Sequence, residues 1–204
     1  MQIKPEYKVF LYLSLSFVIF TIVGTLTHEG GHFLMATCLH VPATLHYNFT
    51  SLEAEMINAQ SRLYITLAGP LVSMGLGTYG FYLCLKMQKK QETTEALTAT
   101  QWLSILLSLF WLRPLFNFIR HGVLYFFSNG ATLRSDEEQL ADYLALPSHS
   151  ISATMAFISL LLLLWVFFKR IPHTQRFTFL LAALFGSLLG YWLWMMAMGP
   201  LILP

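Results

Sequence analysis

Long apolar blocks separated by short polar segments make up almost the whole chain. A helix that crosses a bilayer needs about 20 predominantly apolar residues. Segments of about that length run from about Val9 to Val41, Leu63 to Leu85, Trp102 to Phe127, Ile151 to Phe168 and Phe177 to Leu203. They do not alternate with the period of two that a transmembrane strand requires. The pattern therefore predicts an all-α, polytopic helical membrane protein with about five transmembrane helices.

Two shorter patterns add detail to this arrangement. Ser135, with Glu138 three residues later, is a capping box and predicts a short amphipathic helix that runs through Leu144 at the membrane interface. Small residues also recur at every fourth position in the second and fifth apolar blocks, where they predict close helix packing. These positions are Gly69, Ser73 and Gly77, and Ala182, Gly186 and Gly190.

Composition narrows the class of protein further. Of the 204 residues, 56% are hydrophobic and only 11% are charged, which is too little charge to cover the surface of a soluble domain. The net charge of +2, without a basic run interleaved with aromatic residues, excludes a nucleic-acid partner. We expect one membrane-embedded domain over residues 1–204, in contact with the lipid bilayer.

The basic residues are unevenly divided between the two sides of a five-span arrangement. One side carries Lys4, Lys8, Lys86, Lys89, Lys90, Lys169, Arg170 and Arg176. The other carries only Arg62 and Arg134. Because basic residues favour the cytoplasmic side, we expect a cytoplasmic N-terminus and an integral protein of a bacterial cell membrane.

One polar motif interrupts the first apolar block, His28-Glu29-Gly30-Gly31-His32. Histidines four positions apart project from one face of a helix, so both imidazoles can reach one metal ion, and the intervening glutamate can take a proton from water. Ionisable residues inside a membrane are functional candidates because their burial is costly. We expect His28 and His32 to bind Zn²⁺ and Glu29 to be the catalytic base; the alternative is a polar pair that packs two helices.

A third zinc ligand is needed at a catalytic site, and without a cysteine cluster it has to be an acid. Glu92 and Glu95 lie on the side of the membrane opposite the motif, whereas the acids between positions 136 and 142 lie at its depth. Asp136 is our first choice and Glu137 the second. The alternative is that both acids only favour the N-terminus of the short helix.

The third apolar block has a polar stripe of its own. Arg113, Asn117 and His121 are spaced four residues apart and share one face of a helix. An arginine at this depth is expected to face the bundle interior, towards the zinc site, rather than lipid. These side chains are candidates for orienting a ligand, binding substrate or stabilising an oxyanion. A structural hydrogen-bond network between helices is an equally good interpretation.

The zinc-binding motif within a span, followed by Leu67-Ala68-Gly69-Pro70-Leu71 in the next, resembles the site-2 protease family of intramembrane zinc metalloproteases. The resemblance implies a three-helix catalytic core over residues 1–146, with two additional spans over 147–204. It makes His28 and His32 ligands, Glu29 the base and Asp136 the counterpart of the family's zinc-binding aspartate. The chain has Ser135-Asp136-Glu137-Glu138 where family members usually have Asn-Pro-Asp-Gly or Leu-Asp-Gly, and Ser73 where an asparagine is common.

The function expected from these features is a zinc-dependent endopeptidase acting on membrane-spanning or juxtamembrane substrates, either proteins or peptides. The segment from His46 to Thr50 would offer a strand edge to an unwound substrate. Two alternatives are a zinc-binding pseudoprotease, which the presence of Glu29 argues against, and a small transporter. The transporter is disfavoured because the chain has no inverted repeat.

Overall fold

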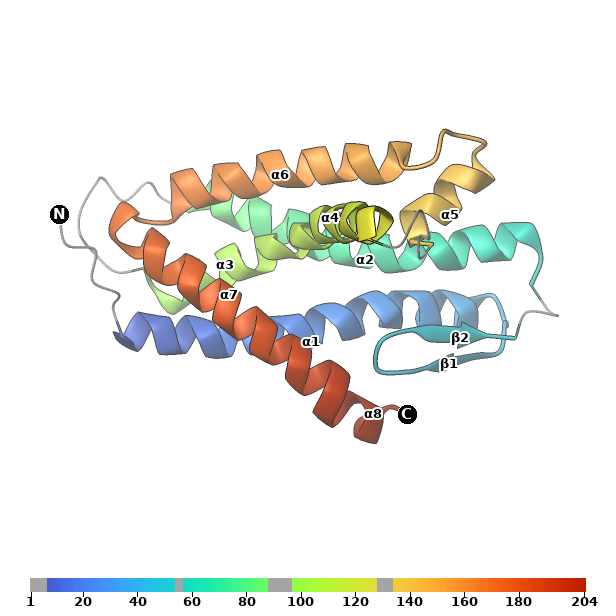
Figure 1. The fold of residues 1–204 in the computed structure, drawn as a ribbon, viewed down its shortest axis with the longest axis horizontal. Helices are drawn as coiled ribbons and strands as arrows, with labels where there is room; N and C mark the ends of the chain where they lie inside the picture. The colour runs from blue at the N-terminus through green and yellow to red at the C-terminus, as the bar shows by residue number, and fades with distance from the viewer. Residues whose placement is uncertain (1–6, 54–56, 88–96, 128–133) are drawn as a thin grey trace.

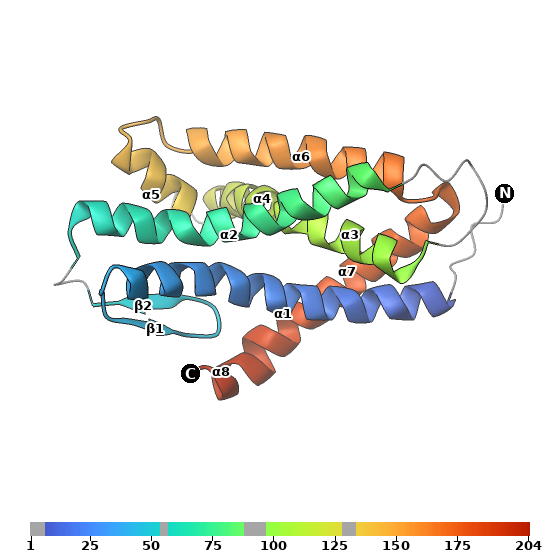
Figure 2. The same cartoon turned by 180° about the vertical axis from the view of Figure 1, so that it is seen from behind.

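The computed structural model describes residues 7–53, 57–87, 97–127 and 134–204. Helices α1 (Tyr7–Cys38), α2 (Ala59–Lys86) and α6 (Ser150–Arg170) run side by side along the long axis of the molecule (Figure 1). Helix α7 (Arg176–Trp192) crosses α1 obliquely, as both views show (Figures 1 and 2). The described chain is predominantly helical, as the sequence predicts.

Four helical segments are long and apolar enough to cross a membrane, which is compatible with the membrane protein predicted from composition. They are Tyr7–Cys38, Ala99–Phe127, Ser150–Arg170 and His173–Ile202. Helix α2 covers the remaining predicted span, but it is not among the four. Glycine, proline and hydroxyl-bearing residues make up much of its sequence and lower its hydropathy. A fifth span therefore stays a prediction.

The third apolar block is not one straight helix. It forms α3 (Ala99–Ser108), a 3₁₀ turn η2 (Leu109–Trp111) and α4 (Leu112–Phe127). Pro114 has no backbone N–H to donate to the carbonyl of Phe110, so the regular hydrogen-bond ladder is broken at this point. Figure 1 shows α4 almost end-on, whereas α2 and α6 lie across the view.

Small residues allow α7 to lie directly on α1, as their spacing predicts. A Cβ atom at Gly186 would overlap the carbonyl oxygen of Ser14 and the side chain of Phe17. Around this contact, buried side chains including Leu13, Phe17 and Phe179 form the main apolar core. In the same core, the rings of Trp102 and Phe179 stack with their centroids 6.0 Å apart.

The predicted short helix is present as α5 (Asp136–Tyr143), and its capping box has both hydrogen bonds. Within the described residues, a short hairpin is the one departure from the all-α prediction. Strands β1 (Ala43–Leu45) and β2 (Thr50–Leu52) form an antiparallel hairpin beside the last turns of α1 (Figures 1 and 2). The segment expected to offer a strand edge supplies the turn of this hairpin and the first residue of β2.

The end of the chain packs on the turn of the hairpin. After α7 come a π-helical turn, η4 (Leu193–Met198), and the short α8 (Gly199–Ile202). The indole N–H of Trp194 donates to the backbone carbonyl of Tyr47 at 2.7 Å. The backbone N–H of Tyr47 donates to the carbonyl of Leu203 at 3.0 Å. The last span and the hairpin are therefore joined directly.

The remaining turn of the chain is η3 (His173–Gln175), which connects α6 to α7. Some residues used to predict which side of the membrane each loop faces lie outside the described part of the chain. They are Lys4, Lys89, Lys90, Glu92 and Glu95. The orientation of the chain in a membrane and the division into a core and two additional spans stay predictions.

Candidate metal centre

Helices α1 and α5 bring the three predicted metal ligands together, although Asp136 is 108 residues from His28 in sequence. One nitrogen of each histidine and one carboxylate oxygen of Asp136 lie within 4.8 Å of one another. Asp136 Oδ2 is 2.9 Å from His28 Nε2 and 3.4 Å from His32 Nε2. The two Nε2 atoms are 3.2 Å apart. We call these three residues the ligand cluster.

Each histidine of the ligand cluster is oriented through its other ring nitrogen. His32 Nδ1 lies 2.6 Å from the carbonyl oxygen of Ile65, which can only accept, so Nδ1 carries the proton. His28 Nδ1 lies 3.1 Å from the hydroxyl of Ser73. That hydroxyl donates to the carbonyl of Gly69 at 3.2 Å, so it accepts from His28. When both rings are neutral, Nε2 therefore carries the lone pair in each of them.

The two Nε2 atoms of the ligand cluster converge on each other and on the carboxylate oxygen of Asp136. Burial alone would raise the pKa of the Asp136 carboxyl, but its contacts with His28 and His32 lower that pKa below the ordinary value. The carboxylate is therefore ionised. Three donor atoms at these distances are held together by a cation between them, either a proton or a metal ion. This donor set fits a zinc ion, which accepts histidine nitrogen and carboxylate oxygen.

Close contact between α1 and α2 makes this orientation possible. A Cβ atom at Gly69 would occupy the position of the His32 imidazole. A Cβ atom at Gly31 would lie 2.8 Å from the carbonyl oxygen of Ala68. The Ala-Gly-Pro segment thus lies against the HEGGH motif. Because Gly31 and Gly69 have no side chains, His32 can approach the carbonyl of Ile65. By contrast, Gly30 of the motif faces open space.

Glu137, the second choice for the third ligand, is not part of the ligand cluster. Its side chain is buried, and its Oε2 atom has no hydrogen-bond partner within the described part of the chain. Adjacent residues of a helix point about 100° apart, so α5 can direct Asp136 at the histidines only by turning Glu137 away from them.

Glu138 anchors α5 to its neighbours, a role that the sequence analysis did not assign beyond the capping box. Its Oε1 atom lies 3.3 Å from His121 Nδ1 on α4 and 2.8 Å from His149 Nδ1 at the start of α6. Its Oε2 atom accepts the backbone N–H of Ser135 at 3.3 Å. One buried carboxylate therefore joins three helices next to Asp136.

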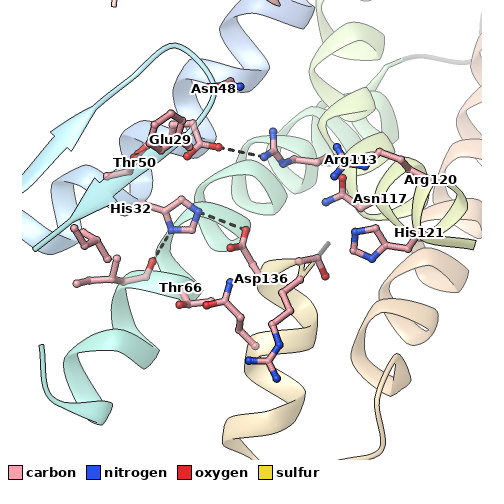
Figure 3. Close-up of a pocket in the computed structure, with 16 residues that line it drawn as sticks. Glu29, His32, Asn48, Thr50, Thr66, Arg113, Asn117, Arg120, His121 and Asp136 are labelled. Carbon is pink, nitrogen blue, oxygen red and sulfur yellow. Dashed lines mark hydrogen bonds and ion pairs between the residues drawn. The ribbon is translucent and has the colours of Figure 1, made fainter. Parts of the chain in front are cut away.

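The predicted polar stripe of α4 faces the site, as Figure 3 shows. Arg113 Nη2 lies 3.4 Å from Glu29 Oε1, next to the ligand cluster. Asn117 and His121 line the same cavity, which has a volume of about 370 Å³. His121 also pairs with Glu138, so it belongs at least in part to the interhelical network. Arg113 is the member of the stripe that contacts the predicted base.

The hairpin forms another wall of this cavity. The hydroxyl of Thr50 donates to the backbone carbonyl of Glu29 at 2.9 Å, and Asn48 and Phe49 of the turn also line the cavity. Sequence reasoning included Thr50 only in the segment expected to offer a strand edge, and it did not identify the partner roles of Ser73 and the Ile65 carbonyl. Two indications pointed to Ser73: its position one turn after Gly69, which was interpreted as packing, and its place where the resembled family commonly has an asparagine.

Comparison of the chain with protein-family models, with curated proteins and with solved structures found no match. The function of this chain is therefore inferred from its own residues and their geometry.

Proposed function

We propose that this protein is a zinc-dependent, membrane-embedded endopeptidase. The observation that carries the proposal is the convergence of His28 Nε2, His32 Nε2 and an Asp136 carboxylate oxygen within 4.8 Å, with Glu29 on the same helix as both histidines. A ligand set of two histidines and one acid is typical of zinc hydrolases. The resemblance of the HEGGH and Ala-Gly-Pro motifs to the site-2 protease family supports the same reaction.

Each residue has a distinct role in this proposal. Zinc, when bound, supplies Lewis-acid chemistry by polarising a peptide carbonyl and lowering the pKa of water towards about 7. Glu29 accepts a proton from the attacking water and returns it to the leaving amine. Arg113, which contacts Glu29, holds that carboxylate in place and presents N–H groups to the oxygen on which negative charge develops.

A membrane-spanning substrate has to change its conformation to use this cavity. The cavity is lined by α4 and β2 and by residues next to and within the first turn of α5. An intact helix is about 10–12 Å wide and satisfies its own backbone carbonyls, so a substrate helix has to unwind before a peptide bond meets Glu29.

The decisive test compares the wild type with Glu29→Gln in detergent or nanodiscs. We expect both proteins to retain one zinc ion per chain, measured by mass spectrometry of metals, and only the wild type to cleave a panel of labelled transmembrane peptides. Zinc retention without cleavage by either protein would favour the pseudoprotease. Absence of stoichiometric zinc from both would contradict the metal site itself.

A further inference from the structure

Helix α4 carries a polar face towards the cavity and an apolar face away from it. Arg113, Asn117 and Arg120, spaced four and three residues apart, line the cavity and are labelled in Figure 3. We call these three residues the polar wall. On other faces of the helix, Phe116 and Ile119 are more than half exposed. This pattern indicates a helix that turns its apolar side to lipid and its polar wall to the cavity.

The polar wall has unused hydrogen-bonding capacity. Arg120 is an exposed residue at the rim of the cavity and has no hydrogen bond or ion pair within the described residues. The side chain of Asn117, which is partly buried, has none either. The Nε atom of Arg113 is buried without a hydrogen-bond partner in the same part of the chain. A guanidinium group presents five N–H donors in a fixed plane, so most donors of the polar wall are directed at no protein acceptor.

Charges around the cavity leave the polar wall positive. Arg113 is balanced by Glu29, and Arg134, also a lining residue, is balanced by Asp142 at 2.7 Å. A divalent ion at Asp136 leaves that position with a charge of about +1. Glu137 is buried on α5 and adds a negative charge near Arg113, whereas Arg120 lines the cavity without an ion-pair partner among the described residues. The cavity therefore favours a ligand that brings negative charge.

We propose that the polar wall binds a carboxylate of the substrate, so that the preferred peptides carry an acidic side chain or a free carboxyl terminus within a few residues of the scissile bond. This inference rests on the proposed peptidase function and names its substrate class. Arginine pairs with a carboxylate through two parallel N–H···O bonds, and the Asn117 amide, between the two arginines in sequence, adds a further donor.

A peptide carboxylate is favoured over the headgroup of an anionic lipid because of where the polar wall lies. Arg113 contacts the predicted base, and Arg120 lines the same cavity as Glu29, His32 and Asp136. A group bound there shares the cavity with the peptide bond to be cut. A lipid headgroup in this position would exclude the substrate.

The experiment measures binding, so that it does not depend on turnover. The probes are two fluorescent ten-residue leucine–alanine peptides that differ only in a central Glu or Gln, with N-methylated flanking amides that resist hydrolysis. The zinc-loaded wild type in phosphatidylcholine nanodiscs is expected to bind the Glu peptide about tenfold more tightly. Arg120→Gln is expected to remove this preference, and Arg120→Lys to keep part of it.

Arg62→Gln is the matched control, because Arg62 is an exposed arginine outside the cavity, and it is expected to keep the tenfold preference. Equal affinity of the wild type for the two peptides would overturn the proposal, even if the enzyme cleaves peptides. A preference that persists in Arg120→Gln would also overturn it. If Arg120→Gln changes only the retention of phosphatidylglycerol in mixed nanodiscs, the polar wall binds a lipid headgroup instead.

Discussion

At the scale of single residues, the Nδ1 protons of two histidines determine what the candidate centre can bind. His32 donates to the carbonyl of Ile65 and His28 donates to Ser73, so both Nε2 lone pairs face Asp136. Second partners of this kind fix the tautomer and the direction of an imidazole ligand before a metal arrives. If either histidine adopted the other tautomer, its Nε2 atom would carry a proton and could not bind the cation.

Ser73→Ala tests this orientation. The substitution removes the acceptor of the His28 Nδ1 proton, and we expect zinc affinity to fall by about 10- to 100-fold, measured by competition with a chromophoric chelator. Ser104→Ala is the control, because Ser104 is also buried and donates to a backbone carbonyl of its own helix, that of Thr100. If both variants bind zinc like the wild type, Ser73 does not orient His28.

The types of the site residues were predictable, but their partners were not. Spacing within one helix identified His28, Glu29 and His32, and the depth of the acids in the membrane selected Asp136. The partners of the histidines come from α2, through a backbone carbonyl and a small hydroxyl residue. A backbone carbonyl has no sequence pattern, and Ser73 has the same spacing as packing residues. Only the three-dimensional contact of α1 with α2 distinguishes them.

At the scale of elements, α5 is short and depends on Glu138 for its position. We expect Glu138→Gln to weaken zinc binding about tenfold, because the loss of the carboxylate charge loosens contacts with His121 and His149 and lets Asp136 move. The measurement is again chelator competition. Asp142→Asn is the control on the same helix, because Asp142 pairs with Arg134 at the surface. Equal zinc affinity of the two variants would contradict a positioning role for Glu138.

The packing of α7 on α1 leads to a second prediction at this scale. A methyl group at Gly186 would overlap the backbone of α1, so Gly186→Ala is expected to lower the free energy of unfolding in detergent by about 1–3 kcal/mol. Gly122→Ala is the matched control, because a Cβ atom there meets nothing within 4 Å. We expect the control to unfold at the same denaturant concentration as the wild type or at a slightly higher one.

Hydrophobic blocks predicted where most helices lie, because length and apolarity alone define such segments. They did not predict the break between α3 and α4, because the apolar character is continuous there. The break arises at Pro114, which cannot donate a backbone hydrogen bond. Nor did they predict the hairpin as a two-stranded sheet. Its strands have three residues each, too few to show an alternating pattern, and its turn is held by Trp194 from the far end of the chain.

At the scale of the whole molecule, the open question of α2 has a direct test. Cys38 and Cys84 are replaced by serine, and a single cysteine is introduced as Arg62→Cys or Lys86→Cys, at exposed positions near opposite ends of α2. We expect a membrane-impermeant maleimide to label intact cells at position 62 and, only after lysis, at position 86. The reverse pattern would invert the predicted orientation. Equal labelling of both would show that α2 does not cross the bilayer.

The separation of Asp136 from His28 by 108 residues also sets a time order during synthesis. A ribosome adds about 5–20 residues per second, so both histidines leave it roughly 5–20 s before the acid that completes their coordination. A nascent chain that carries only α1 cannot hold a metal in this way. The chain thus has a built-in delay, because the ligand cluster is complete only after α5 has been delivered to α1.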